Sequence, residues 1–217
     1  MNILCVKWGD KYSAKYVNIL FNMVSRNITI PFDFHCYTDD PVGIDTQINI
    51  IPIPKNNDLK IWWNKLAMFQ KDFLPGQKLY FDLDLVIQNN IECFITREFH
   101  KIKCYWKPDH ESNELGNTPN NSSIMSWYGN SMSHVWDDFL EDKDFHLQHL
   151  GIDRFMTLEY PYLKTYPRGL IYSYTRGASL EDNEEFKLRS EYRVCLFHQY
   201  PKQEDHPFSE IVKTYWK

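Results

Sequence analysis

Strand-like and helix-like patterns alternate along the first 87 residues, and this alternation restricts the fold more than any other feature. Short apolar runs over residues 2–6, 34–37 and 48–53 are bounded by turn residues and predict strands. Apolar residues recur at helical spacing over 17–24 and again over 62–73, where Pro-Gly follows. The alternation predicts βαβ units and a largely parallel sheet, whose ligands bind beyond the carboxyl ends of the strands.

The rest of the chain is less regular. No Gly/Ser-rich tract, charge block or repeat divides it, and 217 residues suffice for one sizeable core, so we expect a single α/β domain. The patterns predict strands at 102–106, 124–128, 170–174 and 192–197, a short helix near 135–140, a terminal helix at 207–216 and a long loop at 107–122.

Two carboxylates, Asp82 and Asp84, interrupt the apolar run of residues 79–87. Charged groups are rarely buried unless they are paired or bound to a metal. In a continuous strand both side chains would leave the same face and could converge on one cation. The alternative is a strand that ends at Phe81, with both acids in a solvated turn; the apolar residues after Asp84 favour the continuous strand.

Mg²⁺ and Mn²⁺ are the cations that such carboxylates suit, because these hard ions take oxygen ligands and keep positions open for phosphates. His198 ends a later predicted strand, and Lys202 lies four residues beyond it. These two side chains could supply a third metal ligand and a cation for a phosphate.

The composition of the chain limits the kinds of molecule that it is expected to bind. The net charge of -5 and the pI near 5.9 argue against general binding of nucleic acid or membrane surfaces, and no apolar stretch approaches membrane-spanning length. Aromatic residues make up 16% of the chain and suit cavities for sugars and nucleobases. Five scattered cysteines without C-x-x-C spacing, and an N-terminus without a signal-peptide pattern, predict a cytoplasmic protein.

Five segments occur together in this order: Val6 to Tyr12, Thr38-Asp39, Trp63-Asn64-Lys65, Tyr80 to Asp84, and Phe197-His198 with Pro201-Lys202. With them the chain resembles small nucleotide-sugar glycosyltransferases of the GT-A fold, in particular the glycogenin and lipopolysaccharide galactosyltransferase group and its compact bacterial and phage relatives. The resemblance implies one GT-A domain over 1–217, with a mixed, mainly parallel sheet flanked by helices. Residues 1–88 would be a nucleotide-binding half ending in D-x-D, and 89–217 an acceptor and sugar half with a metal-binding histidine.

The resemblance also implies a site. Asp82, Asp84 and His198 would hold Mn²⁺ or Mg²⁺ on the diphosphate of a UDP-sugar, which Lys202 would also contact. Asp153 is the nearest match for an acid near the reacting sugar. Further donor contacts are implied for Val6, Lys7, Tyr12, Asp39, Lys65, Asp82, Leu83 and Asn121.

The implied reaction is retaining transfer of a hexosyl group to a hydroxyl of a saccharide or glycoconjugate, without a dedicated base. The sequence departs from relatives at Gln199, where a glycine is common, at Gln203, where a proline is common, and after Asn121-Ser122, where a glycine is missing.

Two alternatives stay open. Asp82-Leu83-Asp84-Leu85-Val86 also matches the nucleophile motif of haloacid-dehalogenase-like phosphatases, in which Asp82 would attack phosphorus. That motif usually follows the first strand of its domain, whereas three predicted strands precede it here. A nucleotide-sugar binding protein without catalytic activity would also account for the aromatic residues and the missing glycines.

Overall fold

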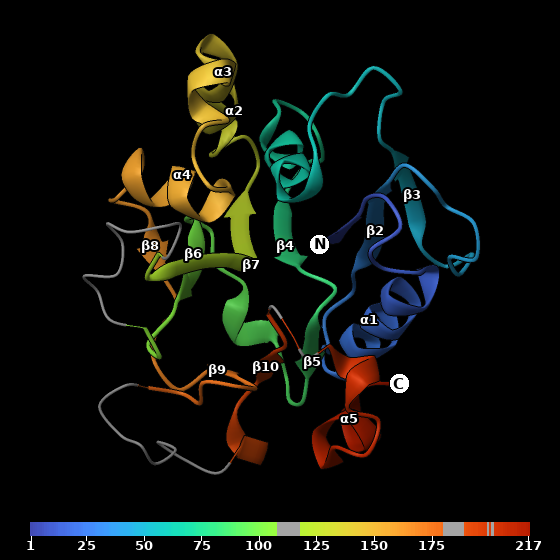
Figure 1. The fold of residues 1–217 in the computed structure, drawn as a ribbon. Helices are drawn as coiled ribbons and strands as arrows, with labels where there is room; N and C mark the ends of the chain where they lie inside the picture. The colour runs from blue at the N-terminus through green and yellow to red at the C-terminus, as the bar shows by residue number, and fades with distance from the viewer. Residues whose placement is uncertain (108–117, 180–188, 199, 201) are drawn as a thin grey trace.

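The computed structural model describes residues 1–107, 118–179, 189–198, 200 and 202–217 (Figure 1). Within this part of the chain, seven strands form one sheet in the order β3-β2-β1-β4-β7-β6-β8, and three form a smaller sheet in the order β5-β10-β9. Neighbours from β3 to β4 are parallel, β7 is antiparallel to both β4 and β6, and β6 is parallel to β8. The predicted α/β class with a mixed, mainly parallel sheet is confirmed.

The first half follows the predicted alternation. Its elements are β1 (Asn2–Lys7), α1 (Ala14–Arg26), β2 (Asp33–Thr38), β3 (Asn49–Pro52), the 3₁₀ helix η1 (Ile61–Phe69) and β4 (Gln77–Phe81). The helix predicted over 62–73 is therefore a 3₁₀ helix that ends before Phe73. Beyond it, the Gln70 and Phe73 amides donate to the carbonyls of Ala67 and Gln70 in separate turns.

The described elements of the second half are shorter. They are β5 (Leu85–Ile87), η2 (Glu92–Phe94), β6 (His100–Lys103), β7 (Asn120–Tyr128), α2 (Ser133–Glu141), α3 (Lys143–His146), α4 (Ile152–Leu158), β8 (Lys164–Thr165), β9 (Ile171–Ser173), η4 (Arg189–Glu191), β10 (Val194–Leu196), η5 (Gln203–Asp205) and α5 (Glu210–Tyr215). The predicted strands, short helix and terminal helix are all present with shifted ends. Of the predicted loop at 107–122, residues 120–122 belong to β7, and residues 108–117 lie outside the described part of the chain.

Two apolar layers cover the large sheet. Along β1, Ile3 and Cys5 pack in the cluster that contains α1, whereas Leu4 packs in the cluster of η1, α2 and α4 on the other face. This alternation follows from the two-residue period of a strand. Figure 1 shows α1 and α5 on one side and α2, α3 and α4 grouped at the other end of the large sheet. Among the described residues, no helix combines the length and the apolar character needed to cross a lipid bilayer.

The continuous strand predicted over residues 79–87 is wrong. β4 ends at Phe81, β5 begins at Leu85, and the two belong to different sheets. β5 pairs antiparallel with β10, so the chain leaves the large sheet at Asp82 to reach a new partner strand. The acids nonetheless do not lie in a solvated turn, because the side chains of Asp82 and Asp84 are only 19% and 15% exposed.

Candidate functional site

A cavity of about 650 Å³ opens at the carboxyl ends of β1 and β4, where the chain passes between the two sheets. This is the location that parallel α/β sheets favour for ligands. The cavity brings together these predicted site residues: Val6, Tyr12, Lys65, Asp82, Leu83, Asp84, Asn121, Asp153, His198 and Lys202.

Asp82 is held by one cation and one hydroxyl. The ammonium of Lys65, from η1, lies 2.8 Å from Oδ1 and 2.9 Å from Oδ2. The hydroxyl of Tyr80 donates to Oδ1 at 2.5 Å, and burial raises the pKa of Tyr80, which keeps this donor protonated. Lys65 also donates to the Ser122 hydroxyl at 3.1 Å. Asp82 is thus fixed between η1 and β7 on one wall of the cavity.

Asp84 is held by residues from both ends of the chain. Lys202 Nζ lies 2.6 Å from Oδ2, and the Tyr12 hydroxyl donates to the same oxygen at 2.9 Å. Burial raises the pKa of Asp84, but the Lys202 ammonium and the Tyr12 hydroxyl outweigh burial and hold this pKa below its usual value. Lys202 Nζ also donates to the Phe197 carbonyl at 2.9 Å, which anchors it beside β10.

His198 follows β10 and faces the same cavity. Its ring lies parallel to that of Trp106, with centroids 5.9 Å apart, and its Nε2 is 3.3 Å from the Ser173 hydroxyl. Burial lowers the pKa of His198 to about 4, so the imidazole is neutral near pH 7. A neutral imidazole is the form that binds a metal ion.

The donor set of Asp82, Asp84 and His198 suits Mn²⁺ in its chemistry, with two carboxylates and a neutral imidazole. Both donors to Asp84 from the described residues act on Oδ2, which leaves Oδ1 for a cation. The ligand atoms of these three side chains, however, are too far apart to bind one ion together. In the described part of the chain only one trio of metal-ligating side chains has all its ligand atoms within 4.8 Å of one another, and it lies elsewhere. Metal binding here would require Asp82, Asp84 and His198 to draw together.

Lys7 and Asp39 lie outside this cavity, in a neighbouring depression of about 520 Å³ that shares Gly9, Asp10 and Tyr12 with it. Both carboxylate oxygens of Asp39 accept from the Gly9 amide, at 3.1 and 3.2 Å, and Lys7 Nζ donates to the Asp40 carbonyl at 3.1 Å. Gly9 has a φ of +65°, which favours glycine. In the structure Lys7 and Asp39 shape the loop after β1, and their donor contacts stay a prediction.

Asp153 and Asn121 line the cavity next to Ser122 and are joined to each other. Asp153, in the first turn of α4, accepts from the Ser122 amide at 2.8 Å and from Asn121 Nδ2 at 3.2 Å. The Asn121 side-chain oxygen in turn accepts from the Ser123 amide at 2.8 Å. This network fixes the start of α4 against β7 with a carboxylate at the edge of the cavity, and a catalytic role for Asp153 stays a prediction.

The sequence-based site omits three tryptophans that line the cavity: Trp8, Trp62 and Trp106. Trp8 could have been found, because it directly follows β1 at the carboxyl end of a parallel strand. Trp62 and Trp106 carry no such signal. Trp62 packs so closely on Gly151 that a Cβ added there would lie 2.7 Å from the indole nitrogen, so this part of the wall depends on a contact between distant segments.

The arrangement of sheets and helices is that of the GT-A fold. The chain superimposes over its full length on an active-site mutant of LgtC, with a TM-score of 0.68, 11% sequence identity and 97% of that chain covered. The galactosyltransferase LgtC in complex with donor and acceptor sugar analogs gives a TM-score of 0.66 at 12% identity, again with full coverage of this chain and 97% of the other.

The glycosyltransferase GlyE of Streptococcus pneumoniae TIGR4 has the same fold, with a TM-score of 0.67 and 8% identity. The match covers 93% of this chain but only 56% of GlyE. No protein-family model and no curated protein sequence matches the chain. The structural matches confirm the predicted fold. Because the sequence identities are low, the reaction has to be inferred from the residues that line the cavity.

Proposed function

We propose that the protein is a glycosyltransferase that moves a hexosyl group from a UDP-sugar to a hydroxyl of a saccharide or glycoconjugate, with Mn²⁺ or Mg²⁺ at Asp82, Asp84 and His198. The observation that carries this proposal is the convergence of two carboxylates and two lysines in one cavity of a GT-A fold. LgtC, which shares the fold, has been crystallised with donor and acceptor sugar analogs.

The lysines have a role in this reaction. A diphosphate leaving group gains negative charge as the sugar departs, and fixed cations in a partly dry cavity stabilise that charge. Lys65 and Lys202 are 10% and 11% exposed, close to the carboxylates and able to turn toward a phosphate. A divalent metal would add Lewis-acid stabilisation of the same leaving group.

Aromatic and polar walls fit the remainder of a UDP-sugar. Trp8 and Tyr12 line the cavity near the loop after β1, where a base would lie, and Asn121 and Asp153 line the opposite wall, where the hexosyl group would lie. Tyr12 also donates to Asp84, so it would link the base region to the metal ligands. A retaining reaction without a dedicated base needs no further carboxylate, and Asp153 would orient the sugar.

The phosphatase alternative fits the structure less well. The nucleophile motif of that class usually follows the first strand of its domain, whereas Asp82 follows the fourth strand of this chain. Release of phosphate from an aryl phosphate, lost in Asp82→Asn, would favour this alternative over glycosyl transfer.

The test is a screen of nucleotide-sugars for Mn²⁺-dependent hydrolysis or transfer, together with calorimetric binding of UDP. We expect Asp84→Ala to abolish the metal-dependent part of UDP binding, while Asp45→Ala, in the loop between β2 and β3, serves as the control. Intact metal-dependent binding in Asp84→Ala would contradict the assignment of the metal site. If the protein binds UDP with Mn²⁺ but consumes no UDP-sugar, it is a binding protein without transferase activity.

A further inference from the structure

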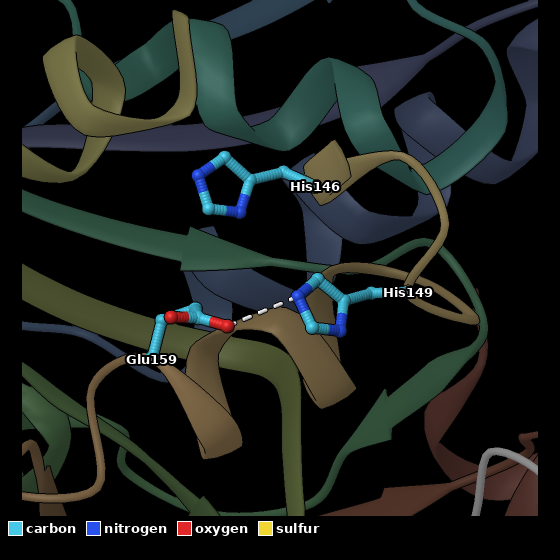
Figure 2. Close-up of side chains that lie close together, drawn as sticks. All are labelled: His146, His149 and Glu159. Atoms are coloured by element: carbon cyan, nitrogen blue, oxygen red, sulfur yellow. Dashed lines mark hydrogen bonds and ion pairs between the residues drawn. The ribbon is translucent and has the colours of Figure 1, made fainter. Parts of the chain in front are cut away.

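A second group of metal-ligating side chains lies outside the cavity. His146 ends α3, His149 lies in the turn that follows, and Glu159 caps the end of α4. One ligand atom from each of the three lies within 4.8 Å of the others. Figure 2 shows the three side chains converging from these two segments, with the His146 ring beside the pair formed by His149 and Glu159.

The backbone already holds the two histidines in place. The His149 amide donates to the His146 carbonyl at 3.1 Å, so both side chains belong to one turn. Both rings pack on Phe155 of α4, with centroids 5.0 and 5.9 Å from its ring. The Glu159 amide donates to the Phe155 carbonyl at 3.0 Å, which fixes the carboxylate relative to the same phenylalanine. Because these contacts already fix the three residues, binding an ion would cost little additional conformational entropy.

The spacing of the ligand atoms is close to that of a metal site. His149 Nε2 and Glu159 Oε1 are 3.1 Å apart. Two ligands at the usual metal distances in a tetrahedral site are about 3.4 Å apart. His146 has to approach by about 1.4 Å at most to complete the same geometry.

His146 carries an additional sign of a missing partner. Its Nδ1 is buried and has no hydrogen-bond partner among the described residues. Buried polar atoms in native structures are nearly always paired, and leaving one unpaired is destabilising. A cation bound to this nitrogen would remove that cost. The side chains of His149 and Glu159 remain 12% and 36% exposed, which leaves a path for the ion and for a water as fourth ligand.

We propose that His146, His149 and Glu159 form a binding site for a transition-metal cation of the zinc class, separate from the cavity. Two imidazoles and one carboxylate favour Zn²⁺, Co²⁺ or Ni²⁺ over Mg²⁺ and Mn²⁺, which prefer oxygen ligands. The bound ion joins α3 to the end of α4. Between its ligands along the chain lie Leu150, Gly151 and Asp153, which form one wall of the cavity, so the ion braces that wall.

The experiment is titration of the chelator-treated full chain with Co²⁺, followed by its visible absorption, and with Zn²⁺ in competition with a chromophoric chelator. We expect one equivalent to bind with the spectrum of tetrahedral cobalt in Asp82→Asn/Asp84→Asn, which lacks the acids of the cavity and therefore reports this site alone, and the variants below are compared in that background. Glu159→Gln keeps a hydrogen-bond acceptor for His149 but loses the charge, and should weaken Zn²⁺ binding by at least about 100-fold. His149→Gln should do the same.

The matched control is His134→Gln, an exposed histidine of α2 whose ring packs on Tyr160 near the same helices. It should bind Zn²⁺ as the protein with an intact trio does in the same Asp82→Asn/Asp84→Asn background, and thermal unfolding in chelator verifies that every variant is folded. The proposal is overturned if Glu159→Gln and His149→Gln bind Zn²⁺ as tightly as His134→Gln. It is equally overturned if the Asp82→Asn/Asp84→Asn protein binds none, in which case the trio is only a hydrogen-bonded pair beside a histidine. Neither result bears on glycosyl transfer.

Discussion

The ion pair between Lys202 and Asp84 allows a quantitative test of how the cavity is held together. Its atoms are 2.6 Å apart, and the two side chains are 11% and 15% exposed. Removing one partner of a buried pair costs about 3–5 kcal/mol, mainly because the other charge stays buried without compensation. Since some exposure remains here, we expect Lys202→Met to lower the free energy of unfolding by about 2–4 kcal/mol.

The assay is equilibrium unfolding in urea with chelator present, for Lys202→Met, Asp84→Asn and the double variant. The double variant leaves no unpaired charge, so its cost should fall short of the sum of the single costs by at least about 1.5 kcal/mol. The control pair is Lys164 and Glu98, whose side chains are 59% and 68% exposed. Lys164→Met should change stability by less than about 1 kcal/mol.

Manganese provides a second arm of this test. In the proposed enzyme Lys202 competes with the metal for Asp84, so its removal should make the carboxylate a better ligand. Mn²⁺ should therefore raise the unfolding midpoint of Lys202→Met by more than it raises that of the wild type. Single costs that add within about 0.5 kcal/mol would refute the coupling. An equal effect of Mn²⁺ on the two proteins would refute the competition alone.

Three further predictions concern other parts of the structure. Burial lowers the pKa of Lys101 from 10.5 to about 8. Between these two values the unfolded state binds more protons than the folded state, so the free energy of unfolding should rise with pH. Lys101→Met should reduce this rise, measured by urea unfolding at about pH 8 and about pH 9.5. Gly151→Ala puts a Cβ 2.7 Å from Trp62 Nε1 at a φ of +117° and should cost about 2–3 kcal/mol in thermal unfolding, against about 1 kcal/mol for Gly9→Ala, which has open space. In the proposed enzyme Asp153 orients the sugar, so Asp153→Asn should lower the rate of UDP-sugar hydrolysis at least about 10-fold and leave the calorimetric affinity for UDP unchanged.

The sequence predicts the large sheet well because its strands carry their own signal. Residues 2–6 and 34–37 are largely apolar on both faces, as buried parallel strands must be, and β1 and β2 cover them with only small changes at the ends. The helix expected over 62–73 illustrates the weaker case. Most of its apolar residues are buried, but over Ile61–Phe69 the backbone forms a 3₁₀ helix, which the spacing of apolar residues does not distinguish from an α-helix.

The partners of the two acids could not be read from the sequence. Lys65 and Asp82 are 17 residues apart, and Lys202 and Asp84 are 118 apart, so both pairs depend on packing between elements. The strand prediction through residue 87 failed for the same reason. An apolar run after Asp84 indicates burial, but it does not specify which sheet buries it, and the partner β10 lies more than 100 residues further along the chain.

The break between β4 and β5 explains how two acids can lie so close together in a largely buried segment. In a continuous strand both carboxylates would project from one face and would have to share their neutralising partners there. Because the chain turns at Asp82, one acid meets Lys65 and Tyr80, and the other meets Lys202 and Tyr12. Each charge is neutralised by the chain's own residues. In the proposed enzyme the two acids would hold the divalent cation and the two lysines would hold the diphosphate, so the charges of these four side chains would balance both without the donor and with it.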